Sequence, residues 1–496
     1  MQVNSLLKKA MGASALALVG VALTGCGTPA ANNAPATTPA AAPTEVYVPE
    51  GGLTGTLRIA SFTNEAQIHA LAFQELHPNL NIHFEFVSMD GGEYQGWITP
   101  IMSGIGTPFD IIYMETDFAR SFIENDGWFY DLSDFITPHI NAAGTFPASV
   151  ELGRVGNEIR GLSYQLTPGA MFFRRSMALE YFGTDDPAQL QAYFSDWDTA
   201  INSARQIRDL SGGSTFFISG PADIWRPFQP NRSQPWVVDG ALHIDDVAVQ
   251  WMTTSYTLRS EGLDAEVGQW SGEWFAGMSD TLTNAAGESI RTFAYFAPTW
   301  WLPFVLGNNG GATLGDLNAG VYGDWGIIPG PMPFQWGGTW LGVPQAASNT
   351  EAALEFVRFI TTDQEFLTNW ALGHYSNDHL QSIDASASPT IVPGSDLGQP
   401  AGDLISSSVL VNSLGDYFYG TFASNVVAGQ NPFTFFGSPA VAGSVTFAVA
   451  QGTDATIGDA FIDANDLFIT GQATLEEALA SFRSSVQTAL PHINVN

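Results

Sequence analysis

Strand and helix patterns alternate after the N-terminal fifty residues, and this alternation restricts the fold more than any other feature of the chain. Apolar runs typical of strands occupy residues 56–62, 81–87 and 110–114. A helical pattern of apolar residues separates the first two runs and ends before Pro78, and a second helix is predicted around 94–104. The succession βαβαβ predicts a parallel sheet with right-handed crossovers, and therefore an α/β fold.

Polar residues follow all three of these predicted strands, at residues 62–65, 88–92 and 115–117. Asn64 and Glu65 come after the first strand, and Asp117 comes after the third. Ligands of parallel sheets bind at the carboxyl ends of the strands, so we expect these three side chains to contact a ligand. Alternatively, Asn64 and Asp117 cap the helices that follow them. The sequence leaves both interpretations open.

The N-terminus has the pattern of a secretion signal. Lys8 and Lys9 precede an apolar run over 13–23, which is too short to span a bilayer permanently. The run ends in Leu-Thr-Gly-Cys at Cys26, which resembles the bacterial lipobox. We therefore expect residues 1–25 to be a lipoprotein signal peptide and Cys26 to carry the lipid.

Residues 26–52 follow as a segment rich in Ala, Pro and Thr, which predicts a disordered tether behind the lipidated Cys26. Cys26 is the only cysteine, which excludes an intrachain disulfide and a thiolate zinc cluster. The eight histidines are scattered along the chain. We expect neither a metal ion nor a cofactor.

The charge is strongly negative. Beyond residue 25, 14 arginines against 49 acidic residues leave a net charge of −35. Such a chain repels nucleic acid and anionic lipid headgroups, so we expect no nucleic-acid partner and membrane contact only through the lipid anchor. The acidity either attracts cations or a basic partner, or serves solubility outside the cell.

Later segments add helices and an irregular middle. A helix is predicted from 350 to about 372, and Thr474 with Glu477 forms a capping box before another. Residues 211–240 and 265–345 are rich in Trp, Gly, Pro and Phe and show few helical patterns. Irregular backbone with aromatic side chains is where we expect binding residues.

Several of these segments, in this order, resemble the extracellular solute-binding proteins of family 1, the sugar-binding group related to maltose-binding protein. The helix before Pro78 is similar to the family's F-E-x-x-x-P, with Gln74 in place of the glutamate. The resemblance covers about residues 53–490. Its carriers are residues 56–59, 73–79, 110–117, 161–164, 171–175, 337–343 and 349–353.

The resemblance implies an α/β fold of the two-lobe, periplasmic-binding-protein-like type II class, with the ligand in a cleft between the lobes. It implies a first lobe of residues 53–166 plus 330–375. The second lobe would comprise residues 167–329 plus 376–496. Binding would close the two lobes by a hinge movement.

The resemblance also implies ligand-binding residues. By position, Asp117 looks like an acidic residue that bonds sugar hydroxyls, and Trp300 looks like a tryptophan of the cleft. Trp340 lies beside the second crossover, and Trp301 and Tyr375 are further candidates. Tryptophans supply flat apolar area against sugar faces, although each is also suited to a core. Of the adjacent Trp300 and Trp301, we expect one to point outward.

The chain departs from the family pattern at three places. Met114 stands where several relatives have an aromatic platform, and residues 173–175 replace the usual Tyr-Asn-Lys. Residues 373–377 replace a typical Gly-Tyr-Leu-Pro stretch. These differences concern the identity of the ligand.

Together, these features predict a lipid-anchored, monomeric binding protein of an ABC importer, exported to the outer face of the cell membrane. It would capture a mono- or oligosaccharide and dock onto the permease subunits. One alternative keeps the fold and changes the solute to a polyamine, a metal complex or a peptide. A surface sensor without a transporter is another. An exported glycan-active enzyme is a third, but the sequence has no G-x-S-x-G, H-E-x-x-H or phosphate loop.

Overall fold

The computed structural model describes residues 41–495, apart from residue 64 and the ranges 307–308, 312–319, 373–374, 376–403 and 422–429. All of these residues belong to one compact unit, Thr38–Asn496. The predicted signal peptide, Cys26 and the site candidate Asn64 lie outside the described residues. None of the described helices is long and apolar enough to cross a membrane.

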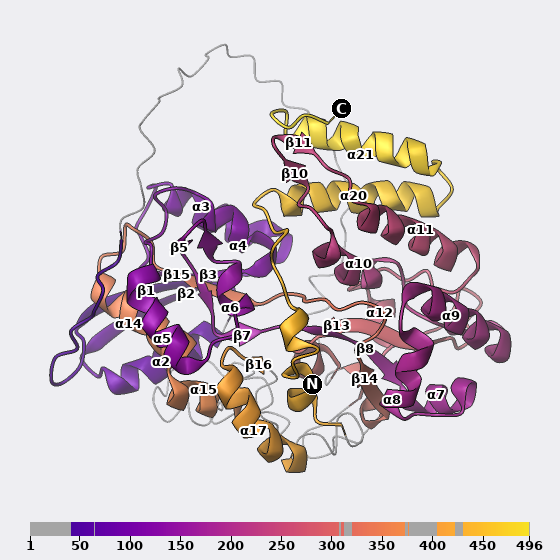
Figure 1. The fold of residues 1–496 in the computed structure, drawn as a ribbon, viewed down its shortest axis with the longest axis horizontal. Coiled ribbons are helices and arrows are strands. Elements are labelled where there is room, and N and C mark those ends of the chain that lie inside the picture. The colour runs from indigo at the N-terminus through magenta and orange to yellow at the C-terminus, as the bar shows by residue number, and fades with distance from the viewer. Residues whose placement is uncertain are drawn as a thin grey trace. The chain divides into compact units, whose positions relative to one another are not determined.

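The first sheet, called the β1 sheet below, has five strands in the order β2-β1-β3-β15-β6 (Figure 1). Its first three strands pair in parallel, and β15 is antiparallel to both of its neighbours. The predicted βαβαβ succession is confirmed, because α2 and α3 fill the predicted helical segments. The elements are β1 (Gly55–Ser61), α2 (Glu65–Leu76), β2 (Leu80–Phe86), α3 (Glu93–Met102), β3 (Ile111–Glu115), β15 (Thr339–Gly342) and β6 (Leu162–Ser163).

The strand β3 is buried along its whole length, and its side chains serve two cores. Ile111 and Tyr113 pack into one hydrophobic core, whereas Ile112 and Met114 pack into another. This division follows from the period of two in a strand, where successive side chains point to opposite faces. The sheet is therefore covered on both sides, as expected for parallel strands.

The second sheet, called the β8 sheet, has three antiparallel strands in the order β13-β8-β14. The central strand again divides its side chains between cores: Ala170 and Phe172 join the first core, and Met171 and Phe173 join one on the opposite face. The strands are β8 (Gly169–Arg174), β13 (Ala294–Pro298) and β14 (Trp325–Ile328).

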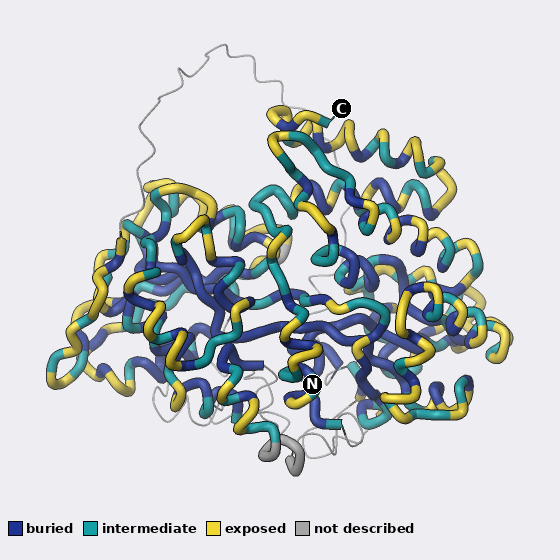
Figure 2. Tube along the Cα trace, in the orientation of Figure 1, coloured by how far each residue is buried: buried dark blue, intermediate teal, exposed yellow. Residues whose placement is uncertain are grey.

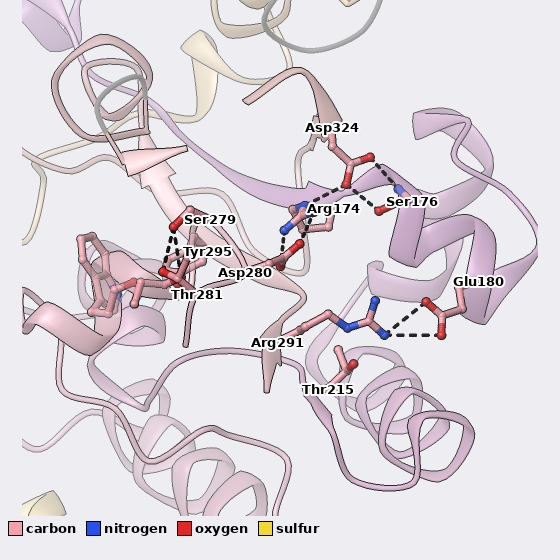
Figure 3. Close-up of polar contacts among 12 residues, drawn as sticks. Arg174, Ser176, Glu180, Thr215, Ser279, Asp280, Thr281, Arg291, Tyr295 and Asp324 are labelled. Atoms are coloured by element: carbon pink, nitrogen blue, oxygen red, sulfur yellow. Dashed lines mark hydrogen bonds and ion pairs between the residues drawn. The ribbon is translucent and has the colours of Figure 1, made fainter. Parts of the chain in front are cut away.

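The end of β8 is fixed by a buried guanidinium (Figure 3). Arg174, with a side chain 3% exposed, donates to both carboxylate oxygens of Asp280 at 2.6 and 2.9 Å. Its Nε donates to Asp324 at 2.9 Å, and the other oxygen of Asp324 accepts from the backbone N–H of Ser176. The pairing neutralises the buried charge and ties β8 to the segments on both sides of it.

The remaining helices bury one face and expose the opposite face (Figure 2). The helices not yet named are α4 (Thr116–Ile123), α5 (Ser133–Ala143), α6 (Ala148–Glu151), α7 (Arg175–Phe182), α8 (Pro187–Leu190), α9 (Trp197–Ser211), α10 (Ala222–Phe228), α11 (Asp246–Ser260), α12 (Gly272–Ala276), α14 (Thr350–Thr362), α15 (Gln364–Ala371), α17 (Ser408–Thr421), α19 (Pro432–Phe436), α20 (Asp454–Ile469) and α21 (Leu475–Ala489). Of these, α21 packs on α20, which in turn packs on α11. Short strands are β4 (Arg154–Val155), β5 (Glu158–Ile159), β7 (Gln165–Leu166), β9 (Thr215–Phe216), β10 (Val237–Val238), β11 (Ala241–Leu242), β12 (Arg291–Thr292) and β16 (Leu404–Ile405).

The prediction of one helix from 350 to about 372 is wrong in one respect, because the structure has two helices there. α14 ends at Thr362, and α15 begins at Gln364. Asp363 takes an extended conformation between them, and its carboxylate accepts the backbone N–H groups of Glu365 and Phe366. An aspartate that caps a new helix interrupts the apolar pattern without disturbing its spacing.

Three described segments of the chain pass between the parts built on the two sheets. The first pass joins β6 to β8 and the second joins β14 to β15. These two are paired: Pro168 forms an antiparallel bridge with Gln335, and the N–H of Trp336 donates to the carbonyl of Thr167 at 3.1 Å. The third pass leads into α20, which packs with α21 against the β8 sheet side.

Candidate functional site

A cavity of about 310 Å³ lies where these passes meet. The first turn of α4, which follows β3, forms its wall on the β1 sheet side. The helices α10 and α20 form the opposite wall. Residues 335–337 and 446–451, on the second and third passes, complete the lining. The cavity thus sits beside the carboxyl end of a parallel strand, where α/β folds bind ligands.

An ion pair bridges the two walls of the cavity. Asp117, in the first turn of α4, accepts from both terminal nitrogens of Arg226 on α10, at 2.8 and 2.9 Å. Burial raises the pKa of Asp117, but the attraction of the Arg226 guanidinium outweighs it, and the pKa lies below its ordinary value. The carboxylate is therefore charged at neutral pH and bound bidentately.

Two further groups surround this pair. The guanidinium of Arg226 lies 5.0 Å from the ring centroid of Trp336, a cation–π arrangement. Glu115, at the end of β3, caps α4 by accepting the N–H of Asp117 at 2.6 Å. Burial and the neighbouring Asp117 charge raise the pKa of Glu115 well above its usual range.

A second ion pair lies deeper in the cavity and is incompletely satisfied. The side chain of Arg232 is 1% exposed, and its Nη2 lies 3.6 Å from Asp454 Oδ2. Within the described part of the chain, Arg232 Nη1, Asp454 Oδ1 and Gln335 Oε1 have no hydrogen-bond partner. Burial lowers the pKa of Arg232 and raises that of Asp454 to about 6. Buried polar atoms without partners are costly, and these three have almost no accessible surface, so a ligand reaches them only if the wall rearranges.

Three tryptophans gather at one edge of the cavity. Trp300 donates its indole N–H to the carbonyl of Trp336 at 3.0 Å, and the two rings meet edge to face. Trp270 lies parallel to Trp300, with ring centroids 6.4 Å apart and an interplanar angle of 10°. Trp336 lines the cavity, so the cluster continues its apolar surface.

Of the residues predicted from the sequence, two lie at this place. Asp117 lines the cavity. Trp300 is half-buried and contacts the lining residue Trp336, whereas Trp301 is completely buried. Of the two adjacent tryptophans, Trp300 is therefore the more exposed.

The other described candidates lie in the cores. Trp301 packs against Phe172 and Trp325, and Tyr375 packs against Phe366. Trp340 is 1% exposed and donates its indole N–H to the lining residue Thr116 at 3.1 Å. Glu65 is buried at the start of α2 and accepts from Tyr164 Oη at 2.6 Å. None of these candidates lines the cavity.

The sequence analysis missed the arginines of the cavity. Arg226 and Arg232 lie in the Trp- and Pro-rich segment 211–240, where binding residues were expected. Their charge was the available signal, because arginine is scarce in a chain with 49 acidic residues. Trp336 and Asp454 are also unpredicted, since their contribution depends on the packing of distant segments.

The side chains of the lining are of kinds that bind small molecules. In the described ranges, no three His, Cys, Asp or Glu side chains are grouped so that they could hold a metal ion. The cavity instead combines paired charges, unpartnered donors and acceptors, and aromatic edges. Such a set can hold a small polar molecule with apolar faces.

Comparison with protein families gives one match. Residues 70–377, more than half of the chain, match the model described as bacterial extracellular solute-binding protein. No curated protein matches the sequence significantly.

Solved structures share the fold at low identity. One is an extracellular solute-binding protein of family 1, with TM-score 0.66 and 17% identity over 88% of this chain and 99% of that chain. The ABC transporter associated binding protein from B. animalis subsp. lactis Bl-04, in complex with β-1,6-galactobiose, has TM-score 0.57 and 17% identity, covering 88% and 98%. Maltose-bound T. maritima MalE3 has TM-score 0.58 and 14% identity, covering 88% and 100%. These likenesses extend over nearly all of each structure and show the same two-lobe α/β fold.

Proposed function

Because this chain belongs to the bacterial extracellular solute-binding proteins, we propose that it captures a neutral carbohydrate in the cavity between α4, α10 and α20. The captured solute is then passed to the permease of an ABC importer. The observation that carries this proposal is the pairing of charges in a cavity that still has unpartnered donors and acceptors.

The charges of the lining balance. Three arginines and three aspartates line the cavity: Arg120, Arg226, Arg232, Asp117, Asp454 and Asp459. Each arginine is already paired with a carboxylate of this chain. A solute of high charge would break these pairs and leave a buried charge uncompensated, so a neutral solute is favoured.

The unpartnered atoms favour a carbohydrate over a polyamine as the solute. Arg232 Nη1 needs an acceptor, while Asp454 Oδ1 and Gln335 Oε1 need donors. Sugar hydroxyls donate and accept, and can satisfy all three. Ammonium groups only donate, so a polyamine would leave Arg232 unsatisfied.

The apolar part of the lining supports the same class of solute. Trp336 and Phe447 present ring edges and faces beside the paired charges. Sugars carry C–H faces that pack on such rings while their hydroxyls reach the polar groups. Two of the three solved structures named above were determined with a sugar, one with β-1,6-galactobiose and one with maltose.

The proposal extends to the N-terminus. The family is extracellular, and the sequence Leu23-Thr24-Gly25-Cys26 is similar to a lipobox. We infer that the chain is exported and held at the outer face of the membrane by lipid on Cys26. Residues from Ala41 onward already contact the folded unit, since the N–H of Ala42 donates to the carbonyl of Asp131 at 2.8 Å.

A thermal-shift screen of the purified protein against neutral sugars, polyamines and peptides tests this function. A solute at about 100 times its dissociation constant adds about 2.7 kcal/mol of stability, which raises the melting temperature clearly. We expect a shift with one group of sugars, weakened about tenfold in affinity by Asp454→Asn, since an acceptor becomes a donor. Asp466→Asn, on the same helix but outside the cavity lining, is the matched control.

Other results of the screen contradict the proposal. A shift with spermidine or putrescine alone would change the solute class and retain the family. A sugar shift that Asp454→Asn and Asp466→Asn leave equally intact would place the carbohydrate elsewhere in the molecule.

A further inference from the structure

A loop beside the cavity holds a tryptophan in an unusual backbone conformation. Trp270 has a φ of 67°, and its side chain is 43% exposed. The only other non-glycine residues with positive φ in the described ranges are Asp239, Glu266 and Asp280. Aspartate tolerates this region, whereas for a bulky aromatic residue it is a true outlier. Such strain persists only where the surroundings enforce it, and it gathers at binding sites.

The surroundings of Trp270 do enforce it. The preceding Gln269 donates through Nε2 to Asp223 Oδ1 at 3.1 Å. Trp274, four residues later, donates its indole N–H to the same oxygen at 2.9 Å. Asp223 is 2% exposed and belongs to α10, the helix that carries Arg226. The loop is thus fastened on both sides of Trp270 to a helix of the cavity wall.

The ring of Trp270 extends the aromatic surface of the cavity outward. It lies parallel to Trp300 at 6.4 Å, and its centroid is 5.7 Å from that of Trp336, which lines the cavity. The cavity itself, about 310 Å³, is at the small end of ligand sites, which span about 300–1,000 Å³. A longer solute that fills the cavity must therefore continue past its edge, where the exposed ring stands.

We propose that Trp270 forms an outer stacking subsite for a second sugar ring, so that the solute is an oligosaccharide of at least two units. This inference rests on the proposed function, because it assumes that the cavity holds the first ring. A flat indole held in place by its neighbours stacks on a sugar face with little loss of side-chain entropy.

The test measures whether the preference for a longer glycan over a monosaccharide depends on the residue at position 270. An array of neutral glycans of one to six units identifies binders, and titration calorimetry then compares each binder with its terminal monosaccharide. We expect the intact protein to bind the longer glycan about tenfold more tightly than the monosaccharide. Trp270→Ala and Trp270→Gly should abolish that preference and leave monosaccharide affinity unchanged. Tyr256→Ala, which removes an equally exposed ring (43%) from outside the cavity lining, should retain it.

Melting temperatures of the two variants distinguish a role of Trp270 in ligand binding from a role in stability alone. Glycine adopts positive φ freely and alanine does not, so Trp270→Gly should melt higher than Trp270→Ala while both lose the length preference. If the length preference survives in Trp270→Ala, the subsite is overturned. It is also overturned if the substitutions weaken binding of the monosaccharide and the longer glycan equally. If the intact protein binds no glycan on the array, the proposed carbohydrate-binding function is wrong, and the subsite that rests on it is wrong too.

Discussion

At the residue scale, the helix α10 contains a buried carboxyl group that forms no ion pair with the residues described by the structure. Asp223 is 2% exposed, and its Oδ1 accepts from Gln269 and Trp274. Its Oδ2 has no partner among the residues that the structure describes. Burial raises the pKa of Asp223 to about 7, and these hydrogen bonds offset only part of that effect. The loop that presents Trp270 is therefore fastened to a group that titrates near neutrality.

This predicts a pH dependence of stability that one substitution removes. The folded pKa of Asp223 lies above its unfolded value of about 4, so the folded protein binds more protons between pH 4 and pH 7. The stability associated with this group is complete below about pH 4 and is lost as the pH rises to about 7. Asp223→Asn keeps the acceptor for Trp274 without the charge.

Urea unfolding at a series of pH values measures the effect. Between pH 5 and pH 6.5, we expect the unfolding free energy of the original protein to fall more steeply with rising pH than that of the variant. The difference between the two slopes should be about 1.4 kcal/mol per pH unit. An identical slope in both proteins would show that Asp223 is already ionised in the folded protein throughout this range.

The residues of the site also show what the sequence can and cannot predict. Asp117 was predicted because it follows a buried strand, and the edge of a parallel sheet has a known relation to ligands. Its partner Arg226 lies 109 residues away, on a helix of the opposite wall. No local sequence pattern predicts the ion pair between Asp117 and Arg226. Trp340 was predicted to stack on a sugar or to lie in a core, because the resemblance gave its place along the chain and not the direction of its buried side chain.

At the scale of elements, local patterns predicted most boundaries within a residue or two. β1, β2 and β3 begin and end close to the expected positions, and the capping box at Thr474 is formed. The failure at Asp363 concerned a break inside a continuous apolar stripe, where one capping carboxylate divided α14 from α15. Caps decide helix ends, and apolar spacing alone does not detect them.

The capping box of α21 is itself a testable contribution. Thr474 Oγ1 accepts the N–H of Glu477 at 3.3 Å, and Glu477 accepts the N–H of Thr474 at 2.8 Å. Thr474→Ala should lower the unfolding free energy by about 1 kcal/mol in urea melts, because it leaves the end of the helix unsatisfied. Thr488→Ala, within the same helix, should change it by less than about 0.5 kcal/mol. Equal losses in the two variants would mean that side-chain packing, and not capping, stabilises α21.

At the scale of the whole molecule, the cavity exists because three passes of the chain bring two sheets together without merging their far cores. α4 approaches from the β1 sheet, and α10 and α20 approach from the β8 sheet. The lining of the gap mixes charged and apolar side chains, and the two sheets also share the first hydrophobic core. We therefore expect any relative movement of the two parts to be a hinge movement at the passes that leaves this shared core packed. The solute is then bound where movement can enclose it.

The Asp117–Arg226 pair is the charged contact that spans this gap, and we expect it to favour the closed form without solute. Half-exposed pairs contribute at most about 1 kcal/mol, which corresponds to a roughly fivefold change in a two-state equilibrium. Arg226→Gln should therefore increase the radius of gyration measured by small-angle X-ray scattering, and saturating solute should restore it. Asp117→Asn should do the same, and the double substitution should add little, because either change already breaks the pair.

The matched control uses an ion pair that lies within one part of the molecule. Arg205 and Glu261 are also bidentate and half-exposed, but both lie on the β8 sheet side. Arg205→Gln should leave the radius of gyration unchanged. If it expands the molecule as much as Arg226→Gln does, the effect is general loss of surface charge pairing. If neither variant expands the molecule, the polar lining holds the two parts together without this pair, and closure does not depend on it.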